Sequence, residues 1–153
     1  MKKTFVIIII LILAATSAFL YLGVEQIILK GSHPLEYSEL VEKYSTQYSV
    51  PKEIIYAVIK TESGFKSDAV SNKGAIGLMQ ITPDTYTWLC TKDNFQSDSP
   101  DMLYNPENNI KAGTLFLSYL YTEFGIWESV YAAYNAGRGK VNEWLENEEY
   151  RKD

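Results

Sequence analysis

Apolar residues recur every three or four positions along most of the chain, which is the spacing that places them on one face of an α-helix. The clearest example is the stretch PKEIIYAVIKTESGF, which begins at Pro51. A proline suits a first helical turn because the amide hydrogen that it lacks would have no partner there. We therefore predict a helix over Pro51–Ser63, whose core-facing stripe consists of Ile54, Ile55, Val58 and Ile59.

Five more helices follow from the same spacing. They are expected from Pro34 to about Tyr48, from Pro83 through Trp88, from Asn105 to Phe124, over Trp127–Asn135, and around Val141, Trp144 and Leu145. Residues 66–74 indicate a loop or small hairpin, and residues 91–103, which are polar and lack periodicity, indicate a loop. Strand-like alternation is nearly absent, so the sequence predicts a single globular domain that is all-α or a helix-dominated α+β fold.

Two helix starts and one helix end are marked by their residue types. Thr82 and Asn105 each place a capping side chain directly before a proline, and Gly125 suits the position after a last helical turn. Gly113 lies on the apolar stripe of the long helix that ends there. We expect this glycine to let another part of the backbone approach.

An unbroken apolar run follows Lys2 and Lys3 and extends to about Gly23. About 20 apolar residues are enough to cross a bilayer, whereas the core of a signal peptide has about 7–15. We expect an uncleaved transmembrane signal-anchor over 1–23 with its lysines in the cytoplasm, a linker over 24–33 and the folded domain over 34–153. The alternative is cleavage near Ala18, which would give a secreted protein. In both cases the domain acts outside the cytoplasmic membrane.

Composition narrows the possible chemistry. The net charge of −5, without a basic cluster beyond the two lysines, argues against a nucleic-acid partner. A single cysteine, Cys90, excludes an internal disulfide or a cysteine-rich zinc site. A single histidine, His33, argues against a Ser-His-Asp or Cys-His mechanism. There is no metal motif and we expect no cofactor, so any catalysis must use carboxylates, hydroxyls and amides.

One acid lies on an apolar stripe. Glu62 follows Val58 by four residues and Ile55 by seven, so it shares their helix face. A carboxylate on a buried face is unfavourable unless it is paired or neutral, and desolvation raises its pKa. A raised pKa is what a general acid needs near neutral pH. The alternative is a glutamate at a helix end that reaches water or caps the next turn.

Three separated segments carry a family resemblance: Glu62–Phe65, Gly77–Ile81 and Ala132–Gly137. In this order and spacing they resemble the catalytic domain of soluble lytic transglycosylases, the glycoside hydrolase family 23 group related to goose-type lysozyme. The resemblance covers about Pro34 to Leu145 and implies a lysozyme-like fold. Supporting matches are Ala69-Val70-Ser71, Gly74-Ala75, Asn105–Ile110 and Ala112-Gly113.

The resemblance implies cleavage of the β-1,4 bond between N-acetylmuramic acid and N-acetylglucosamine in peptidoglycan glycan strands. Family members leave a 1,6-anhydro-muramyl end, because one carboxylate, matched by Glu62, first protonates the glycosidic oxygen and then deprotonates the muramyl C6 hydroxyl. A goose-type muramidase, which would use a water, and a non-catalytic peptidoglycan-binding module are the alternatives. We expect a monomer.

The same resemblance assigns roles to five other residues. Tyr134 matches the tyrosine that hydrogen-bonds and orients the catalytic glutamate, and Asn135 helps to shape the same wall. Ser71, Met79 and Gln80 match residues that line the groove and contact the sugars. We interpret the glycines of these segments, Gly77 and Gly137, as sites of close backbone approach.

A glycosidase with two carboxylates needs the second at about 5–5.5 Å for retention or about 6.5–9.5 Å for inversion. Neither the segment 77–81 nor the segment 132–137 contains an acid. Asp68, in a polar loop, and Asp84, in a first helical turn, remain as candidates, and we interpret both as structural.

The chain departs from the family pattern in two places. Thr82 stands where the family often has a methionine, so contacts in that subsite are expected to differ. The family's last helix, with a segment of Glu-Thr-x-x-Tyr-Val type, has no counterpart before Asp153. We expect either a compact version of the domain with a more open groove or a truncated chain.

Overall fold

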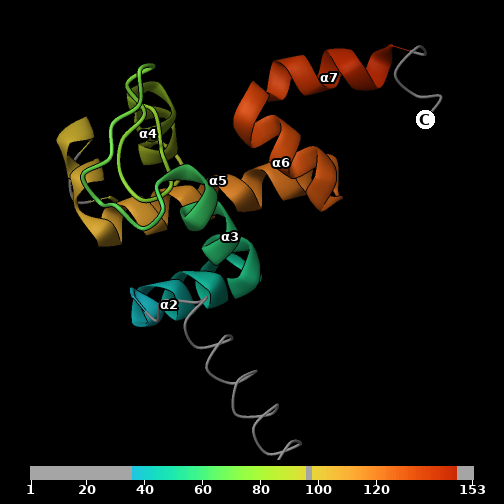
Figure 1. Cartoon of the computed structure of the whole chain (residues 1–153). Helices are drawn as coiled ribbons and strands as arrows, with labels where there is room; N and C mark the ends of the chain where they lie inside the picture. The colour runs from blue at the N-terminus through green and yellow to red at the C-terminus, as the bar shows by residue number, and fades with distance from the viewer. Residues whose placement is uncertain (1–35, 96–97, 148–153) are drawn as a thin grey trace, which may run out of the picture. The chain divides into compact units, whose positions relative to one another are not determined.

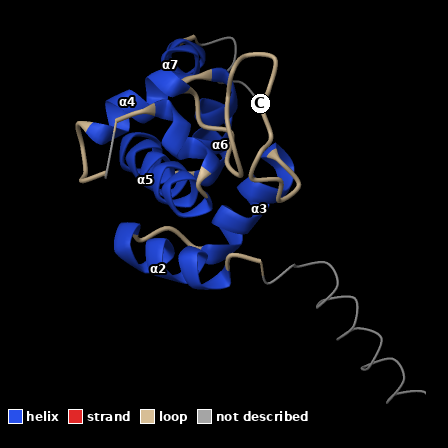
Figure 2. Ribbon diagram, turned by 90° about the vertical axis from the view of Figure 1, so that its left-hand side faces the viewer, coloured by secondary structure: helices blue, strands red, loops and turns tan. Residues whose placement is uncertain are grey.

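The computed structural model describes residues 36–95 and 98–147. Within them the chain forms six α-helices and one 3-10 helix, all in a unit that starts at Tyr37. They are α2 (Ser38–Tyr48), α3 (Lys52–Glu62), α4 (Pro83–Cys90), η1 (Pro100–Tyr104), α5 (Pro106–Phe124), α6 (Trp127–Ala136) and α7 (Arg138–Glu146). Figure 2 shows helices and loops throughout the described residues, where extended pairing is limited to two isolated bridges, Val70–Ile76 and Ile76–Ile81. The helix-dominated prediction is confirmed.

The predicted anchor over 1–23, the linker over 24–33 and the helix start at Pro34 lie outside the described residues. In the part of the chain that is described, no helix is both long and apolar enough to cross a bilayer.

Helix α5 is the centre of the domain. Figure 1 shows it crossing the molecule, with α2 and α3 on one side of it and α4 on the other, while α6 and α7 follow from its C-terminal end. Helices α2, α3, α4 and α6 all contact α5. The side chains of α5 that face these neighbours are fully buried: Ile110, Ala112, Leu117 and Leu120. The apolar stripe predicted for this helix therefore forms the core to which the other elements attach.

The predicted helix limits are confirmed at three positions. The Thr82 hydroxyl accepts the amide hydrogen of Thr85 at 3.3 Å, and the Asn105 side chain accepts that of Asn108 at 3.1 Å. Gly125 ends α5 in the left-handed conformation, with a φ of 74°. In contrast, Pro51 is not in the first turn of α3 but precedes it, because its ψ of 137° is extended.

Two other expectations were wrong. The segment 91–103 is not all loop, because Pro100 starts the 3-10 helix η1, which buries Leu103 completely. Gly113 accommodates a side chain instead of a backbone segment: a Cβ atom at this position would lie 2.3 Å from the Met79 sulfur.

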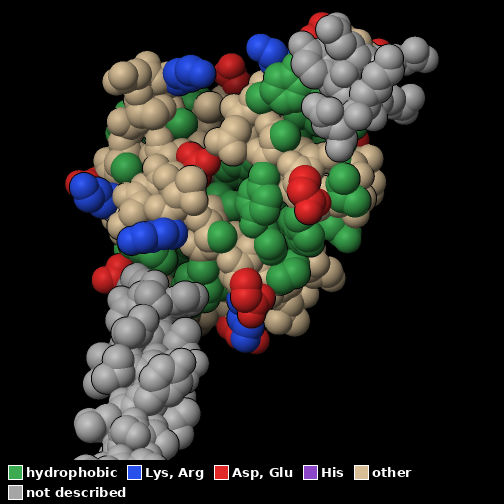
Figure 3. All heavy atoms as spheres, turned by 45° about the vertical axis from the view of Figure 1, so that its right-hand side comes forward, with side chains coloured by type: hydrophobic (Ala, Val, Ile, Leu, Met, Phe, Trp, Pro, Cys, Tyr) green, Lys and Arg blue, Asp and Glu red, His purple; other side chains and the backbone are tan. Residues whose placement is uncertain are grey.

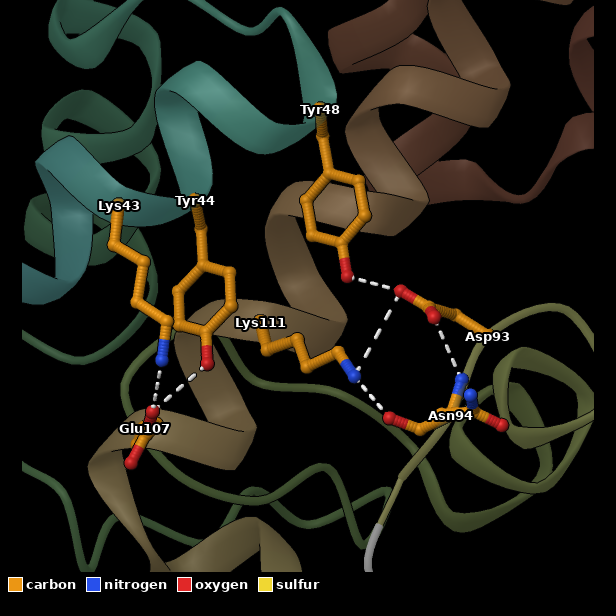
Figure 4. Close-up of polar contacts among 7 residues, drawn as sticks. All are labelled: Lys43, Tyr44, Tyr48, Asp93, Asn94, Glu107 and Lys111. Carbon is orange, nitrogen blue, oxygen red and sulfur yellow. Dashed lines mark hydrogen bonds and ion pairs between the residues drawn. The ribbon is translucent and has the colours of Figure 1, made fainter.

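A polar cluster joins α2 and α5 to the loop that follows α4 (Figure 4). The Tyr48 hydroxyl donates to the Asp93 carboxylate, and Lys111 from α5 lies 3.7 Å from the same carboxylate and donates to the Asn94 carbonyl. Burial acts to raise the pKa of Asp93, but the Tyr48 hydroxyl, the Asn94 amide hydrogen and the Lys111 charge outweigh it, so this pKa lies below its ordinary value. The ionised form of Asp93 is therefore the form that holds this loop.

A second link joins α2 to the start of α5 in the same view. The Glu107 carboxylate accepts from Lys43 at 2.6 Å and from the Tyr44 hydroxyl at 3.0 Å (Figure 4). Lys43 and Glu107 are about half-exposed, so this ion pair contributes less than the buried face of α2 does.

Candidate active site

Two hydrogen bonds bring the three motif segments together. Ser63, the residue after α3, donates its hydroxyl to the Leu78 carbonyl at 2.8 Å. Tyr134, in α6, donates its hydroxyl to the Met79 carbonyl at 2.7 Å. The segment 77–81 is thus held between the C-terminal end of α3 and the C-terminal part of α6. Three segments that are far apart in the sequence form one site, at which Glu62 is the last residue of α3.

The Glu62 carboxyl is half-buried and has no hydrogen-bond or ion-pair partner among the described residues. Burial raises its pKa above the ordinary value for a glutamate. The pKa of Tyr134 is raised well above its ordinary value, first by burial and then by the negative charge of Glu62. Because no group in the described residues stabilises the charged form of Glu62, this carboxyl is easier to protonate than an exposed one. It does not cap the next turn.

Gln80 holds the loop with its amide nitrogen. Its backbone is left-handed, with a φ of 50°, and its Nε2 donates to the Ala69 carbonyl at 3.1 Å and to the Gly77 carbonyl at 2.9 Å. Both amide hydrogens are therefore used within the domain. The side-chain oxygen has no partner among the described residues and is the atom that can accept a hydrogen bond from a ligand.

Asn109 is a residue of this site that the sequence reasoning did not single out. It is fully buried in α5, and its Oδ1 accepts the Met79 amide hydrogen at 2.7 Å. Its Nδ2 donates to the carbonyls of Ile76 and Leu103, both at 2.8 Å. Asn109 therefore fixes the backbone of the segment 77–81 against α5. The only signal for it in the sequence was its place in the motif Asn105–Ile110.

Gly77 is required by this arrangement, as predicted. Its φ is 81°, and a Cβ atom there would lie 2.2 Å from the Asn109 Nδ2 and 2.6 Å from the Leu103 carbonyl oxygen. Gly137 differs from the prediction of close approach, because an added Cβ would meet nothing within 4 Å. Its φ of 91° is what favours glycine there.

The other predicted site residues have mixed placements. Met79 is fully buried with its side chain against Gly113, so it belongs to the core and does not line a groove as expected. Ser71 is exposed, and its oxygen accepts the Ala75 amide hydrogen at 3.0 Å within a turn. Asn135 is exposed and donates to the Tyr131 carbonyl at 3.0 Å.

Two other acids were candidates for a second carboxylate. Asp68 and Asp84 are both exposed, as expected for structural acids. Within the described residues no three His, Cys, Asp or Glu side chains are grouped so that they could hold a metal ion. Figure 3 shows a face on which hydrophobic side chains gather, with an acidic side chain among them. A surface of this kind can stack against sugar rings and place a carboxyl beside them.

The described residues thus form a helical domain in which a half-buried, unpaired glutamate ends α3 and a partly buried tyrosine of α6 is bonded to the segment 77–81. The chain matches the family described as the transglycosylase SLT domain over residues 39–153, and it belongs to that family.

Relatives and solved structures agree with this assignment. The chain is 39% identical over 129 residues to the soluble lytic murein transglycosylase of Escherichia coli K12. The aligned region covers 82% of this chain and 20% of that protein. It is 36% identical over 122 residues to the membrane-bound lytic murein transglycosylase C of Glaesserella parasuis, covering 73% of this chain and 34% of that protein. The chain thus spans about a fifth to a third of these relatives.

Solved structures show the same fold. The crystal structure of the 70 kDa soluble lytic transglycosylase of Escherichia coli matches with a TM-score of 0.68 at 38% identity, over 74% of this chain and 19% of that chain. An inactive Glu-to-Gln mutant of the lytic transglycosylase Slt of Pseudomonas aeruginosa matches with the same TM-score at 32% identity, over 75% of this chain and 19% of that chain. The lysozyme-like SLT fold is therefore confirmed.

Proposed function

We propose that this protein is a peptidoglycan lytic transglycosylase that cleaves the β-1,4 bond between N-acetylmuramic acid and N-acetylglucosamine without water. The observation that carries the proposal is the half-buried Glu62 carboxyl, which has no partner among the described residues. Burial raises the pKa of this carboxyl, and its charge contributes to the raised pKa of Tyr134. The family assignment and the names of the relatives support the same activity.

The proposed reaction uses Glu62 twice. The protonated carboxyl gives its proton to the glycosidic oxygen as the bond from that oxygen to the muramyl C1 breaks. The resulting carboxylate takes the proton of the muramyl C6 hydroxyl while O6 bonds to C1, which closes the 1,6-anhydro ring and returns Glu62 to its protonated form. No water is consumed and no second carboxylate is needed, which agrees with the exposed positions of Asp68 and Asp84.

Tyr134 acts as a positioning residue in this mechanism. Its hydroxyl donates to the Met79 carbonyl, so it fixes the segment 77–81 relative to α6. Gln80 would accept a hydrogen bond from an acetamido N–H through its free side-chain oxygen. The Ser71 hydroxyl hydrogen and the exposed Asn135 amide are the further proposed contacts with the glycan.

We also retain two proposals on the setting of the enzyme. The first is that the enzyme is a monomer. The second is that its domain lies outside the cytoplasmic membrane, where the apolar segment 1–23 anchors it. If that segment is cleaved, the protein is secreted. The membrane-bound relative carries a name that agrees with an anchored form.

Digestion of purified sacculi by the full chain tests the function. Mass spectrometry of the products should show 1,6-anhydro-muramyl ends, and the Glu62→Gln variant should release none. Reducing muramyl ends would identify a goose-type muramidase instead. Release of no fragments by an intact, folded protein would identify a non-catalytic binding module.

A further inference from the structure

A pocket of about 310 Å³ lies where two of the motif segments continue along the chain. It is lined by Asp84, Thr85 and Trp88 from α4, Phe116 from α5, and Arg138, the first residue of α7. Asp84 and Thr85 come shortly after the segment 77–81, and Arg138 comes directly after the segment 132–137. The same two segments that build the candidate active site therefore lead into this pocket.

Ring contacts connect the pocket to Tyr134. The centroid of the Phe116 ring is 5.3 Å from that of Tyr134 and 6.3 Å from that of Trp88. On the side of α4, the Thr82 and Thr85 hydroxyls are hydrogen-bonded at 2.9 Å, which ties the pocket wall to the end of the segment 77–81. A ligand that occupies the site beside Tyr134 is therefore one aromatic ring away from the pocket.

The pocket offers two opposite charges beside an aromatic floor. Arg138 pairs through its Nε with the Glu123 carboxylate at 3.2 Å, and its two terminal nitrogens have no partner among the described residues. The Asp84 carboxylate is exposed and has no partner there either. A guanidinium group with two free nitrogens suits a carboxylate, and a carboxylate suits an ammonium group. Trp88 and Phe116, whose rings contact each other, provide an apolar surface that suits short aliphatic side chains.

We propose that this pocket binds the peptide stem of the muramyl residue, with Arg138 on a stem carboxylate and Asp84 on a stem amine. The proposal rests on the proposed function, since it assigns part of the same substrate. The sugars of the glycan strand present hydroxyl and acetamido groups, which are uncharged. The peptide stems present carboxylates, amines and small apolar side chains, which are the groups that this pocket complements.

The test measures binding instead of cleavage, so that it can be read even if the proposed reaction is wrong. The full chain with Glu62→Gln is titrated calorimetrically with two soluble glycan fragments of equal length. One carries peptide stems, and the other has had them removed by an amidase and the freed lactyl carboxyls converted to methyl amides, so that it carries no carboxylate for Arg138. The stem-bearing fragment should bind about five- to tenfold more tightly, as expected for a partly exposed charged hydrogen-bond pair.

The Arg138→Gln variant in the same background should remove this difference, with no change for the stripped fragment. Lys140→Gln is the matched control, because it removes one positive charge from an exposed position in the same helix without touching the pocket. Lys140→Gln should keep the full difference between the two fragments.

Asp84→Asn provides a second variant, which should weaken binding of the stem-bearing fragment but not of a fragment whose stem amines are acetylated. Equal binding of both fragments by the Glu62→Gln protein, or a difference that survives Arg138→Gln, would overturn the proposal.

Discussion

Replacing Asn109 with alanine tests the part of the site that is most deeply built into the fold. The substitution leaves the Met79 amide hydrogen and the carbonyls of Ile76 and Leu103 without their partner at a position that is fully buried. Each unsatisfied buried group costs about 1–3 kcal/mol. Water entering the vacated space recovers part of this, so we expect a loss of about 3–5 kcal/mol in the free energy of unfolding.

Urea unfolding followed by circular dichroism measures this loss. With an m-value of about 1–3 kcal/mol/M, the midpoint should fall by roughly 2 M. Asn108→Ala is the matched control, because the Asn108 side chain makes no hydrogen bond recorded in the described residues, and it should change stability by less than about 0.5 kcal/mol. If Asn109→Ala lowered the midpoint no more than Asn108→Ala does, Asn109 would not be the support of the segment 77–81.

Two further predictions concern other buried or charged groups. Thr114 is fully buried, and its hydroxyl has no hydrogen-bond partner within residues 36–95 and 98–147. Thr114→Val should therefore raise the free energy of unfolding by about 1 kcal/mol. The control Thr122→Val removes a hydrogen bond to the Ser118 carbonyl and should give no gain in the same melt. The pKa of Asp93 is lower in the folded state than in the unfolded chain. Its contribution to stability is therefore complete above the pKa of the unfolded chain. The contribution is lost as the pH falls from that pKa towards the lower pKa of the folded state. Asp93→Asn should therefore flatten the acid limb of a plot of melting temperature against pH, and an unchanged limb would argue against the cluster in Figure 4.

The helices were predictable because their limits are set by local chemistry. Thr82 and Asn105 cap helices with their own side chains, and Gly125 adopts a conformation that few other residues accept. The 3-10 helix η1 was missed because it is too short to show a period, and only Leu103 in it is fully buried.

The site was predictable in its outline but not in its details. Glu62 lies on a regular helix, so its position on the apolar stripe could be read from spacing alone. The segment 77–81 is irregular, so nothing in the sequence could show that the Met79 side chain points into the core while its carbonyl faces Tyr134. Asn109 was predicted only as part of the motif Asn105–Ile110, without a role of its own. Its partners are three backbone groups from other segments, and only the tertiary structure brings these to it.

The central claim is that Glu62 is a single acid and base whose partly buried carboxyl is kept without a partner. The raised pKa of Glu62 means that the folded state disfavours the charged carboxylate. Glu62→Gln should therefore leave the free energy of unfolding equal or higher at neutral pH. This advantage of the variant should vanish as the pH falls below the pKa of the carboxyl, where Glu62 is protonated. The most direct measurement is the mass spectrum of sacculi digested by the wild-type chain and by Glu62→Gln, taken together with the melting temperature of each. The account predicts anhydro-muramyl ends for the wild type, none for the variant, and a variant that melts no lower; equal turnover by a folded Glu62→Gln protein would contradict it.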